Sequence, residues 1–410
     1  MISRIVLNQI LKQLSKLQHG VLTMQFPDGK KMEFGAVGLG PNATLKIHSE
    51  SVFFDLALGG DIAFAEAFMQ GKWETDNLTA LIKLFLLNKM NSDIQPKFSG
   101  INFLKKIVNS LYKLSRINTI SNSKKNISRH YDLSNKMFSL FLDPTMMYSC
   151  GVFERSDDSL EKSQIQKVHK LIDKAKISES DHVLEIGCGW GTFAIEAVKK
   201  TGCKVSAVTI SKEQYELARQ RCVEAGVQDR VEIIFQDYRN IEGQFDRIVS
   251  IEMLEAVGHA GIKTFFKKCN TLLKQDGLMV LQVITIPDQR YEGYRRSFDF
   301  IRKYIFPGGL LPSVNIMSSA MTKFSSLHIE HLENIGVHYA RTLYEWRKNF
   351  NANLDQVKML GFDQNFIRMW NYYLSSCEAA FSTRWINDVQ LVITRIGNKN
   401  LPLAPYVSTS

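Results

Sequence analysis

The stretch VLEIGCGWG, residues Val183 to Gly191, decides the fold of this chain, because it joins an apolar strand to the helical sequence TFAIEAVKK. Gly187, Gly189 and Gly191 allow the backbone to turn tightly and to approach a ligand closely. Glu185 places a carboxylate beside the turn. Since the acid precedes the glycines and the strand CKVSAVTI follows after one helix, the pattern favours S-adenosylmethionine (SAM) over a dinucleotide. A turn that binds no ligand is the third interpretation.

From about Asp181 onward the sequence alternates between strands and helices. The segments are HVLEIG, TFAIEAVKK, KVSAVTI, KEQYELARQRCVEAG, RVEIIFQD, FDRIVSIEM and GLMVLQVITI. This alternation predicts an α/β fold with a doubly wound parallel sheet and with ligands at the carboxyl ends of the strands. Together with the SAM interpretation of the glycine turn, it implies the mostly parallel, seven-stranded, Rossmann-like sheet of the class I SAM methyltransferases. After Pro287 an aromatic, charged insertion at about 288–377 precedes a last strand in WINDVQLVITRIG. We expect the insertion to form a lid or a wall of the substrate site.

A smaller unit precedes this domain. Its first apolar residues have the spacing of an amphipathic helix that packs on its own domain or on a membrane: Ile2, Val6, Ile10, Leu14 and Leu17. VLTMQF and KKMEFG are typical of strands joined by a PDG turn, and helices follow from about Asp61 to Leu87. We therefore expect a small α+β, partly helical domain and a basic linker over 1–120, and the methyltransferase domain over 121–410.

The composition indicates a globular protein with an acidic partner. The formal net charge is +10, and between Lys89 and Arg129 the basic residues face only Asp93. Nucleic acid, an anionic membrane surface and solubility alone all fit this balance. The six cysteines have no metal-ligand spacing, which predicts reduced thiols in a cytosolic protein and no metal site. No apolar run approaches the about 20 residues that span a bilayer, so we expect neither a secreted nor an integral membrane protein.

Polar side chains follow the second and third strands of the predicted sheet. Thr209 and Gln214 come where many nucleotide-binding folds have an acid, and they are candidates for ribose contact or ordinary strand-end and helix residues. Asp237 can accept a hydrogen bond from the adenine amino group or cap a helix, and the Tyr238 ring can pack on the base.

Two carboxylates follow the fourth strand. Glu252 and Glu255 in EMLEAVGH lie three residues apart at the mouth of the expected site. One of the two carboxylates binds or orients a ligand and the other acts in the reaction, or both belong to the acidic first turn of a helix.

More specific motifs point to one family. HYDLSNKMFSLFLDPTMMYSCGVF at 130–153, EAVG at 255–258, YIFPGGLLPS at 304–313 and the segment around Tyr339 together resemble the cyclopropane fatty acid synthase family. The resemblance runs through nearly the whole chain, and YSC and FPGGLLPS are far more specific than the glycine motif.

The resemblance implies an activity and a set of site residues. Members transfer the SAM methyl group to the cis double bond of an acyl chain in a phospholipid. The positions matching those that contact SAM are Tyr148, Ser149, Gly187, Cys188, Gly189, the stretch from Thr209 to Gln214, Asp237 and Tyr238. The family also holds a bicarbonate ion beside the alkene, at positions matching Cys150, Glu255, Tyr339 and the backbone near Ile284.

Two positions qualify this match. Some members have His where this chain has Gln282, and others have Gln, so an amide would hold the ion here. Cys377 falls where the family has a cysteine once suspected of catalysis. A small buried helical residue is the alternative, since an alkene offers no electrophile to a thiolate.

The expected activity is therefore methyl transfer followed by loss of a proton to bicarbonate, which closes a cyclopropane ring. The alternatives are an enzyme that makes methyl-branched or methylene acyl chains and a lipid-surface protein without turnover. We expect a cytoplasmic protein at the inner face of the membrane, with unsaturated phospholipid and no nucleic acid as partner. Whether it is a monomer or a homodimer, the sequence leaves open.

Overall fold

The computed structural model describes residues 2–38, 40–90 and 134–401 of the 410-residue chain. Most of the basic segment, the expected linker and domain boundary, and residues 130–133 of the first family motif lie outside these residues. Within them, no helix combines the length and apolarity needed to cross a membrane.

The small domain is built on a four-stranded sheet in the order β2-β1-β3-β4. Its elements are α1 (Ile2–Leu14), β1 (Gly20–Gln25), β2 (Lys31–Ala36), β3 (Asn42–Ile47), α2 (Ser51–Gly59), α3 (Asp61–Met69), β4 (Trp73–Glu74) and α4 (Leu78–Met90). The predicted β1–β2 hairpin is antiparallel, whereas β3 pairs with β1 in parallel. Val6, Ile10 and Leu14 of α1 pack into the core of their own domain. Of the two interpretations of this helix, the structure therefore shows internal packing.

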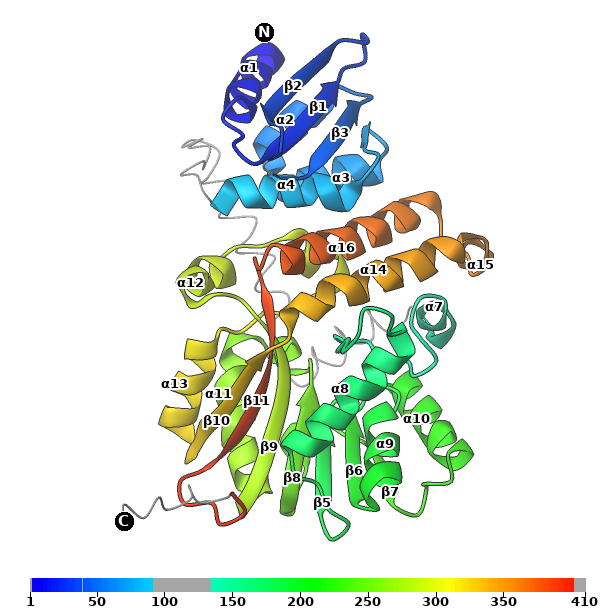
Figure 1. Cartoon of the computed structure of the whole chain (residues 1–410), viewed down its shortest axis with the longest axis vertical. Coiled ribbons are helices and arrows are strands. Elements are labelled where there is room, and N and C mark those ends of the chain that lie inside the picture. Colours follow the sequence, from blue (N-terminus) through cyan, green and yellow to red (C-terminus); the bar gives the residue numbers. More distant parts are fainter. Residues whose placement is uncertain (1, 39, 91–133, 402–410) are drawn as a thin grey trace.

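The large domain contains the expected mostly parallel sheet of seven strands, in the order β10-β11-β9-β8-β5-β6-β7 (Figure 1). The strands are β5 (His182–Ile186), β6 (Lys204–Thr209), β7 (Val231–Phe235), β8 (Phe245–Ile251), β9 (Leu273–Thr285), β10 (Leu327–Asn334) and β11 (Asn387–Arg395). All pairs are parallel except those of β11, which runs antiparallel to both neighbours. The strand order reverses between β5 and β8, and ligands bind at such a switch point in doubly wound sheets.

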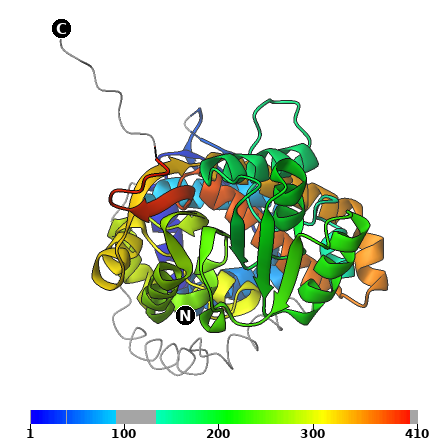
Figure 2. The same cartoon turned by 90° about the horizontal axis from the view of Figure 1, so that it is seen from below.

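Helices cover both faces of this sheet (Figure 2). Alternating side chains explain the two layers: Val183 packs with α8 (Leu160–Lys174) and α9 (Thr192–Thr201), whereas Leu184 packs with α11 (Gly258–Leu272) and α13 (Val314–Phe324). The helix α10 (Lys212–Glu224) lies beside β7. Three short helical segments complete this part: α7 (Asn135–Ser139), η1 (Tyr238–Asn240) and η2 (Leu254–Val257).

The insertion at 288–377 is more than a lid. It contains α12 (Asp288–Arg296), the π-helical turn η3 (Ile301–Ile305), α13, β10, α14 (Gly336–Ala352), α15 (Leu354–Met359) and most of α16 (Gln364–Ser382). The edge strand β10 and the covering helix α13 belong to the sheet layer. The sequence LHIEHLEN did not reveal β10, because an edge strand is largely exposed and can therefore carry polar residues.

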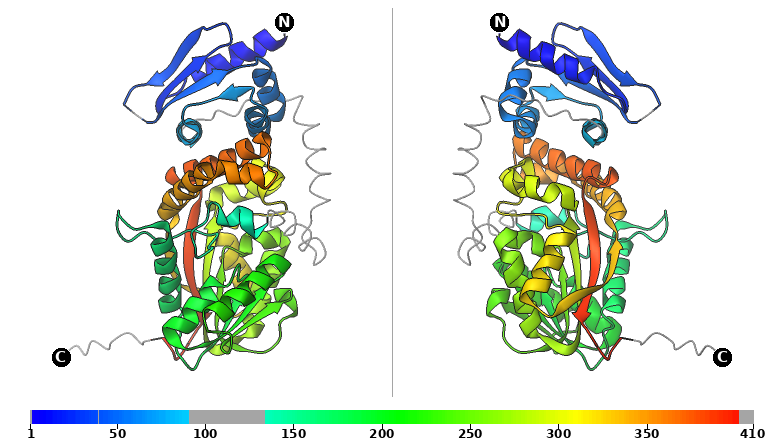
Figure 3. Two further views of the ribbon diagram at one scale, coloured as in Figure 1. Left: turned by 90° about the vertical axis from the view of Figure 1, so that its right-hand side faces the viewer. Right: turned by 90° about the vertical axis from the view of Figure 1, so that its left-hand side faces the viewer.

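Helices α14 and α16 form a layer between the sheet and the small domain (Figure 3). Arg368 of α16 donates to the carbonyl oxygens of Phe68 and Trp73, at 2.5 and 3.0 Å. Tyr304 donates to Glu66 at 2.6 Å, and Lys303 pairs with the same carboxylate. One hydrophobic core runs through both domains. The small domain is thus anchored on the layer that roofs the carboxyl ends of the strands.

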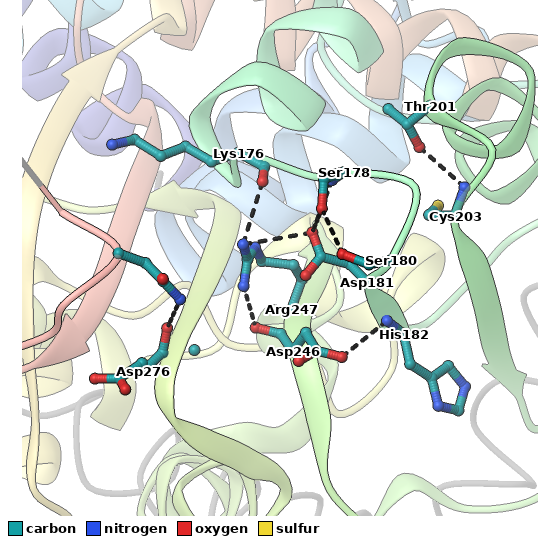
Figure 4. Close-up of polar contacts among 12 residues, drawn as sticks. Lys176, Ser178, Ser180, Asp181, His182, Thr201, Cys203, Asp246, Arg247 and Asp276 are labelled. Carbon is teal, nitrogen blue, oxygen red and sulfur yellow. Dashed lines mark hydrogen bonds and ion pairs between the residues drawn. The ribbon is translucent and has the colours of Figure 1, made fainter.

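The amino ends of the strands are tied together by polar contacts at the opposite edge of the sheet (Figure 4). Arg247 lies 3.4 Å from Asp181 and donates to the carbonyl oxygens of Lys176 and Asp246. The Asp246 carboxylate accepts from the backbone N–H of His182 at 2.9 Å. Since the Arg247 and Asp181 side chains are only 9% and 8% exposed, water cannot replace these contacts easily.

We expect Arg247→Ala to destabilise the protein by about 3 kcal/mol, because it leaves the buried Asp181 charge without its partner. Lys274→Ala is the control, since the Lys274 side chain is exposed and its pair with the half-buried Asp246 should contribute less than about 1 kcal/mol. Urea unfolding of both variants measures the difference. Equal losses of unfolding free energy in the two variants would show that the buried pair contributes no more to stability than the Lys274–Asp246 pair.

Candidate active site

The glycine turn adopts the backbone that its sequence predicted. Gly187, Gly189 and Gly191 have φ values of +85°, +51° and +86°, which side-chain-bearing residues rarely adopt. The N–H groups of Gly187 and Cys188 donate to the Val208 carbonyl oxygen at 2.9 and 3.0 Å, which ties the turn to β6. A Cβ atom on Gly187 would lie 2.8 Å from the Met253 side chain. The turn and the end of β8 are therefore in van der Waals contact.

Glu185 lies buried beneath this turn. Its Oε2 atom has no hydrogen-bond partner among the described residues, and burial raises its pKa well above the usual range. Lys167 of α8, also fully buried, opposes that shift through its charge. An unpaired buried carboxyl oxygen beside a glycine turn fits a ligand that brings a hydrogen-bond donor, such as the amino group of SAM.

The residues after β6 and β7 bond to one another. The Thr209 hydroxyl donates to Gln214 at 2.8 Å. Asp237 caps η1 and forms a two-point ion pair with Arg239, at 2.8 and 2.6 Å. The capping alternative for Asp237 is therefore present, and its role toward adenine stays a prediction. The Tyr238 ring packs edge-on against Phe265.

The YSC segment joins the glycine turn to the helical roof. The Tyr148 hydroxyl bonds to that of Tyr373 at 2.7 Å. The Ser149 hydroxyl accepts from the Lys167 ammonium group at 2.6 Å. Cys150 is fully buried, and its backbone N–H points toward the end of β8.

Glu252 is the centre to which separate parts of the chain converge. Its Oε1 atom accepts from the Cys150 backbone N–H at 2.8 Å and from the Gln282 side-chain amide at 2.9 Å, and its Oε2 atom accepts from the Tyr339 hydroxyl at 2.6 Å. Its own N–H donates to the Gln282 carbonyl oxygen, although its φ of +50° is unusual for a residue with a side chain. The donors expected to hold bicarbonate thus hold a side-chain carboxylate.

A second carboxyl group adjoins this centre. Asp388 of β11 is fully buried and accepts from the Gln282 amide at 3.0 Å, while its Oδ1 atom has no partner among the described residues. Burial, and then the charges of Glu252 and Glu255, raise the pKa of Asp388 well above its usual range. The environment of Asp388 therefore favours its protonated form.

Glu255 lies apart from the three donors around Glu252. Its Oε1 atom accepts from the backbone N–H of Ile284, as the resemblance placed these two residues together, and its Oε2 atom has no partner among the described residues. Burial and the charge of Glu252 raise its pKa to about 8.

The two suspected thiols are poor nucleophiles. Burial raises the pKa of Cys150 well above its usual range and that of Cys377 to about 12, so both stay protonated at neutral pH. The Cys150 thiol contacts the carbonyl oxygens of Gly151 and Ile335, at 3.2 and 3.9 Å. Cys150 thus contributes its backbone N–H to the site.

Aromatic rings surround this centre on the roof side. Tyr339 stacks on Phe381 with ring centroids 4.3 Å apart, and Tyr148 lies 6.2 Å from Phe306. Of the insertion's aromatic residues, Phe300, Tyr304 and Phe306 pack into the core that includes Cys150 and Tyr339, whereas Tyr291 and Tyr294 form a separate cluster.

Sequence analysis missed several members of the site: Lys167, Tyr373, Asp388 and Gln390. Lys167 left one trace, a lysine on the face of α8 that otherwise carries Ser163, Gln164, Val168 and Leu171 inward. Asp388 and Gln390 left another, two polar residues among the apolar residues in the buried first half of the last strand.

We expect Gly187→Ala to abolish SAM binding, because the added Cβ meets Met253 and the left-handed backbone disfavours alanine. Gly226→Ala is the matched control: Gly226 has a φ of +68°, and a Cβ there meets nothing within 4 Å. Gly226→Ala should lower the free energy of unfolding by only about 1 kcal/mol and should keep SAM binding. Calorimetric titration of both variants with SAM is the test, and equal affinities would contradict it.

The raised pKa of Glu255 predicts a stability penalty at alkaline pH. The folded protein holds this proton more tightly than the unfolded chain, so the stabilisation is complete below about pH 4.5 and is lost as pH rises through about 8. Glu255→Gln should therefore flatten the fall of melting temperature between about pH 5 and 9. The exposed Glu242→Gln is the control. Parallel curves for wild type and Glu255→Gln would rule out the penalty.

Comparison with known proteins agrees with this geometry. The family model "Mycolic acid cyclopropane synthetase" matches residues 118–391. Tuberculostearic acid methyltransferase UfaA1 of Mycobacterium tuberculosis is 37% identical, over 82% of this chain and 80% of that protein. Cyclopropane-fatty-acyl-phospholipid synthase of Escherichia coli K12 is 34% identical, over 86% and 88%. The structure of mycolic acid cyclopropane synthase CmaA1 with SAH and CTAB superposes with a TM-score of 0.63 at 31% identity, over 66% of this chain and 98% of that one. The chain belongs to the mycolic acid cyclopropane synthetase family and is a SAM-dependent methyltransferase.

Proposed function

We propose that this enzyme transfers the SAM methyl group to the cis double bond of an unsaturated phospholipid acyl chain and closes a cyclopropane ring. The observation that carries the proposal is the carboxylate centre at Glu252, which adjoins the glycine turn through Met253 and lies in an aromatic surrounding. Such a site combines a glycine turn for the methyl donor, aromatic residues for an apolar chain and a carboxylate for the proton.

The described residues fit SAM. The glycine turn allows close backbone approach, and Glu185 has an unpaired buried oxygen for the amino group. Thr209, Gln214, Asp237 and Tyr238 would surround the ribose and the adenine. When bound, SAM supplies an electrophilic methyl group on a sulfonium.

The protein's part in the reaction is position and electrostatics. An alkene is a weak neutral nucleophile, so the double bond has to be held in line with the methyl group in a dry site. Methyl transfer creates a carbocation on the chain. The rings of Tyr148, Phe306 and Tyr339 can stabilise such a cation through their π faces, and Glu252 through its charge.

The described residues do not fit the expected bicarbonate ion. Cys150, Gln282 and Tyr339 already donate to Glu252, and the Ile284 N–H donates to Glu255. An added anion would have to displace a carboxylate and bring further negative charge beside Glu252 and Glu255. We therefore derive no step through bicarbonate.

A phospholipid is the substrate class that the comparison with the E. coli synthase supports, because that relative is named for a fatty-acyl phospholipid and the match covers 86% of this chain. The net charge of +10 favours an anionic surface. The similarity to UfaA1, named for tuberculostearic acid, favours a second candidate, a methyl-branched or methylene product from the same cation.

The proposal predicts that phospholipid vesicles with cis-unsaturated chains gain one CH₂ unit per modified chain when incubated with the enzyme and SAM. Vesicles of saturated chains are the control and should stay unchanged. Mass spectrometry detects the gain, and proton NMR separates the upfield ring protons of a cyclopropane from a vinylic methylene. A methylene signal would favour the second candidate. Methylation of free fatty acid alone would exclude the phospholipid substrate.

A further inference from the structure

We propose that the Glu252 carboxylate is the proton acceptor of this enzyme and takes the place in which a separate anion would otherwise bind. The inference rests on the proposed methylation of an alkene and adds the identity of its base. It starts from the convergence of one backbone N–H, one amide and one hydroxyl on a single side chain.

These donors come from parts of the chain far apart in sequence, the YSC segment, β9 and α14. Burial raises the pKa of Glu252, whereas these three hydrogen bonds and the charge of Lys167 favour its ionised form. Asp388 accepts one hydrogen bond from the Gln282 amide. The donors that favour a negative charge are therefore concentrated on Glu252.

The orientation of the Gln282 side-chain amide is fixed by a series of hydrogen bonds that begins at Lys174. Lys174, which pairs with Glu333, donates to Gln390 Oε1 at 2.5 Å. An ammonium group can only donate, so the Gln390 amide nitrogen faces Gln282 Oε1, at 3.0 Å. The Gln282 nitrogen must then face Glu252. This chain of amides makes Gln282 a donor toward Glu252, toward Asp388 and toward the Cys150 carbonyl oxygen.

Glu252 is also the reachable member of the centre. Cys150, Gln282 and Asp388 are fully buried and Tyr339 is 5% exposed, whereas Glu252 is only partly buried. Its Oε2 atom accepts one hydrogen bond from Tyr339 and has a second lone pair. Glu255 is less suited, because its carboxylate lies apart from these three donors and accepts from the Ile284 backbone N–H instead.

The backbone of Glu252 gives independent support. Its φ of +50° is strained for a residue with a Cβ, and glycine would avoid that strain. A strained position that nevertheless carries a long acidic side chain is typical of a functional site.

The step balances as follows. The C–S bonding pair stays on sulfur, and the π pair of the alkene forms the bond to the methyl carbon, which leaves a cation on the neighbouring carbon. Glu252 Oε2 takes a proton from the new methyl group, and the released C–H pair closes the ring. The carboxylic acid on Glu252 returns its proton to solvent when the product leaves.

The test is Glu252→Gly, which removes the carboxylate, suits the positive φ and frees the three donors for an added anion. Lys176→Gly is the matched control: Lys176 has a φ of +49° at an exposed position near the opposite edge of the sheet. In buffer stripped of carbon dioxide, wild type and Lys176→Gly should turn over fully, without response to added bicarbonate. Glu252→Gly should lose about 100-fold or more and recover with bicarbonate or acetate.

Ion binding provides a readout apart from turnover. In ¹³C NMR, labelled bicarbonate should bind Glu252→Gly and not wild type. Calorimetry with SAM checks that the variant is folded. If Glu252→Gly does not fold, Glu252→Gln is the second variant: it keeps the volume, cannot accept the proton and should be inactive without rescue.

Two results would overturn the inference: a wild type that needs added bicarbonate, or a Glu252 variant that turns over fully in stripped buffer. Failure of the proposed function has a different signature, since wild type would then methylate no acyl chain. In that case the NMR comparison still tests whether the Glu252 carboxylate occupies an anion-binding position. Absence of bicarbonate binding to Glu252→Gly would show that it does not.

Discussion

The carboxylate of Glu252 is the constraint on which the site depends. A charge out of bulk water is stable only if donors surround it, and here the loop before α8, the strand β9 and the helix α14 each provide one. The positions of these elements are therefore coupled. The strained backbone at Glu252 is held by the same contacts, because its N–H is bonded to β9.

The roof of α14 and α16 is the second determinant of the site. It brings Tyr339 and Tyr373 over the carboxyl ends of the strands, and on its other side it holds the small domain through Arg368. The small domain thus contributes to the geometry of the site through the roof, while none of its described residues bonds to Glu252.

The sequence predicted the fold well because its signals are local. The glycine turn, the alternation of strands and helices and the β1–β2 hairpin each depend on neighbouring residues, and all are present. The strand β10 escaped because its pattern is polar. At the site, motif resemblance brought Glu255 and Ile284 together correctly. The partners of Gln282 and Tyr339 could not be predicted, since they depend on which of two neighbouring glutamates turns inward. The inward direction of Glu252 depends on its positive φ and on Asp388 and Gln390 of β11, which bond to Gln282.

The last strand has a consequence for synthesis of the protein. Gln282 obtains two of its partners, Asp388 and Gln390, from β11, 106 and 108 residues further along the chain. While a ribosome is still translating the insertion, the glycine turn and β8 have emerged, but the amide that faces Glu252 has nothing to orient it. A growing chain can therefore assemble its cofactor end before its reactive centre. The pairing of β11 with β9, rather than the folding of the first strands, would complete the reactive centre.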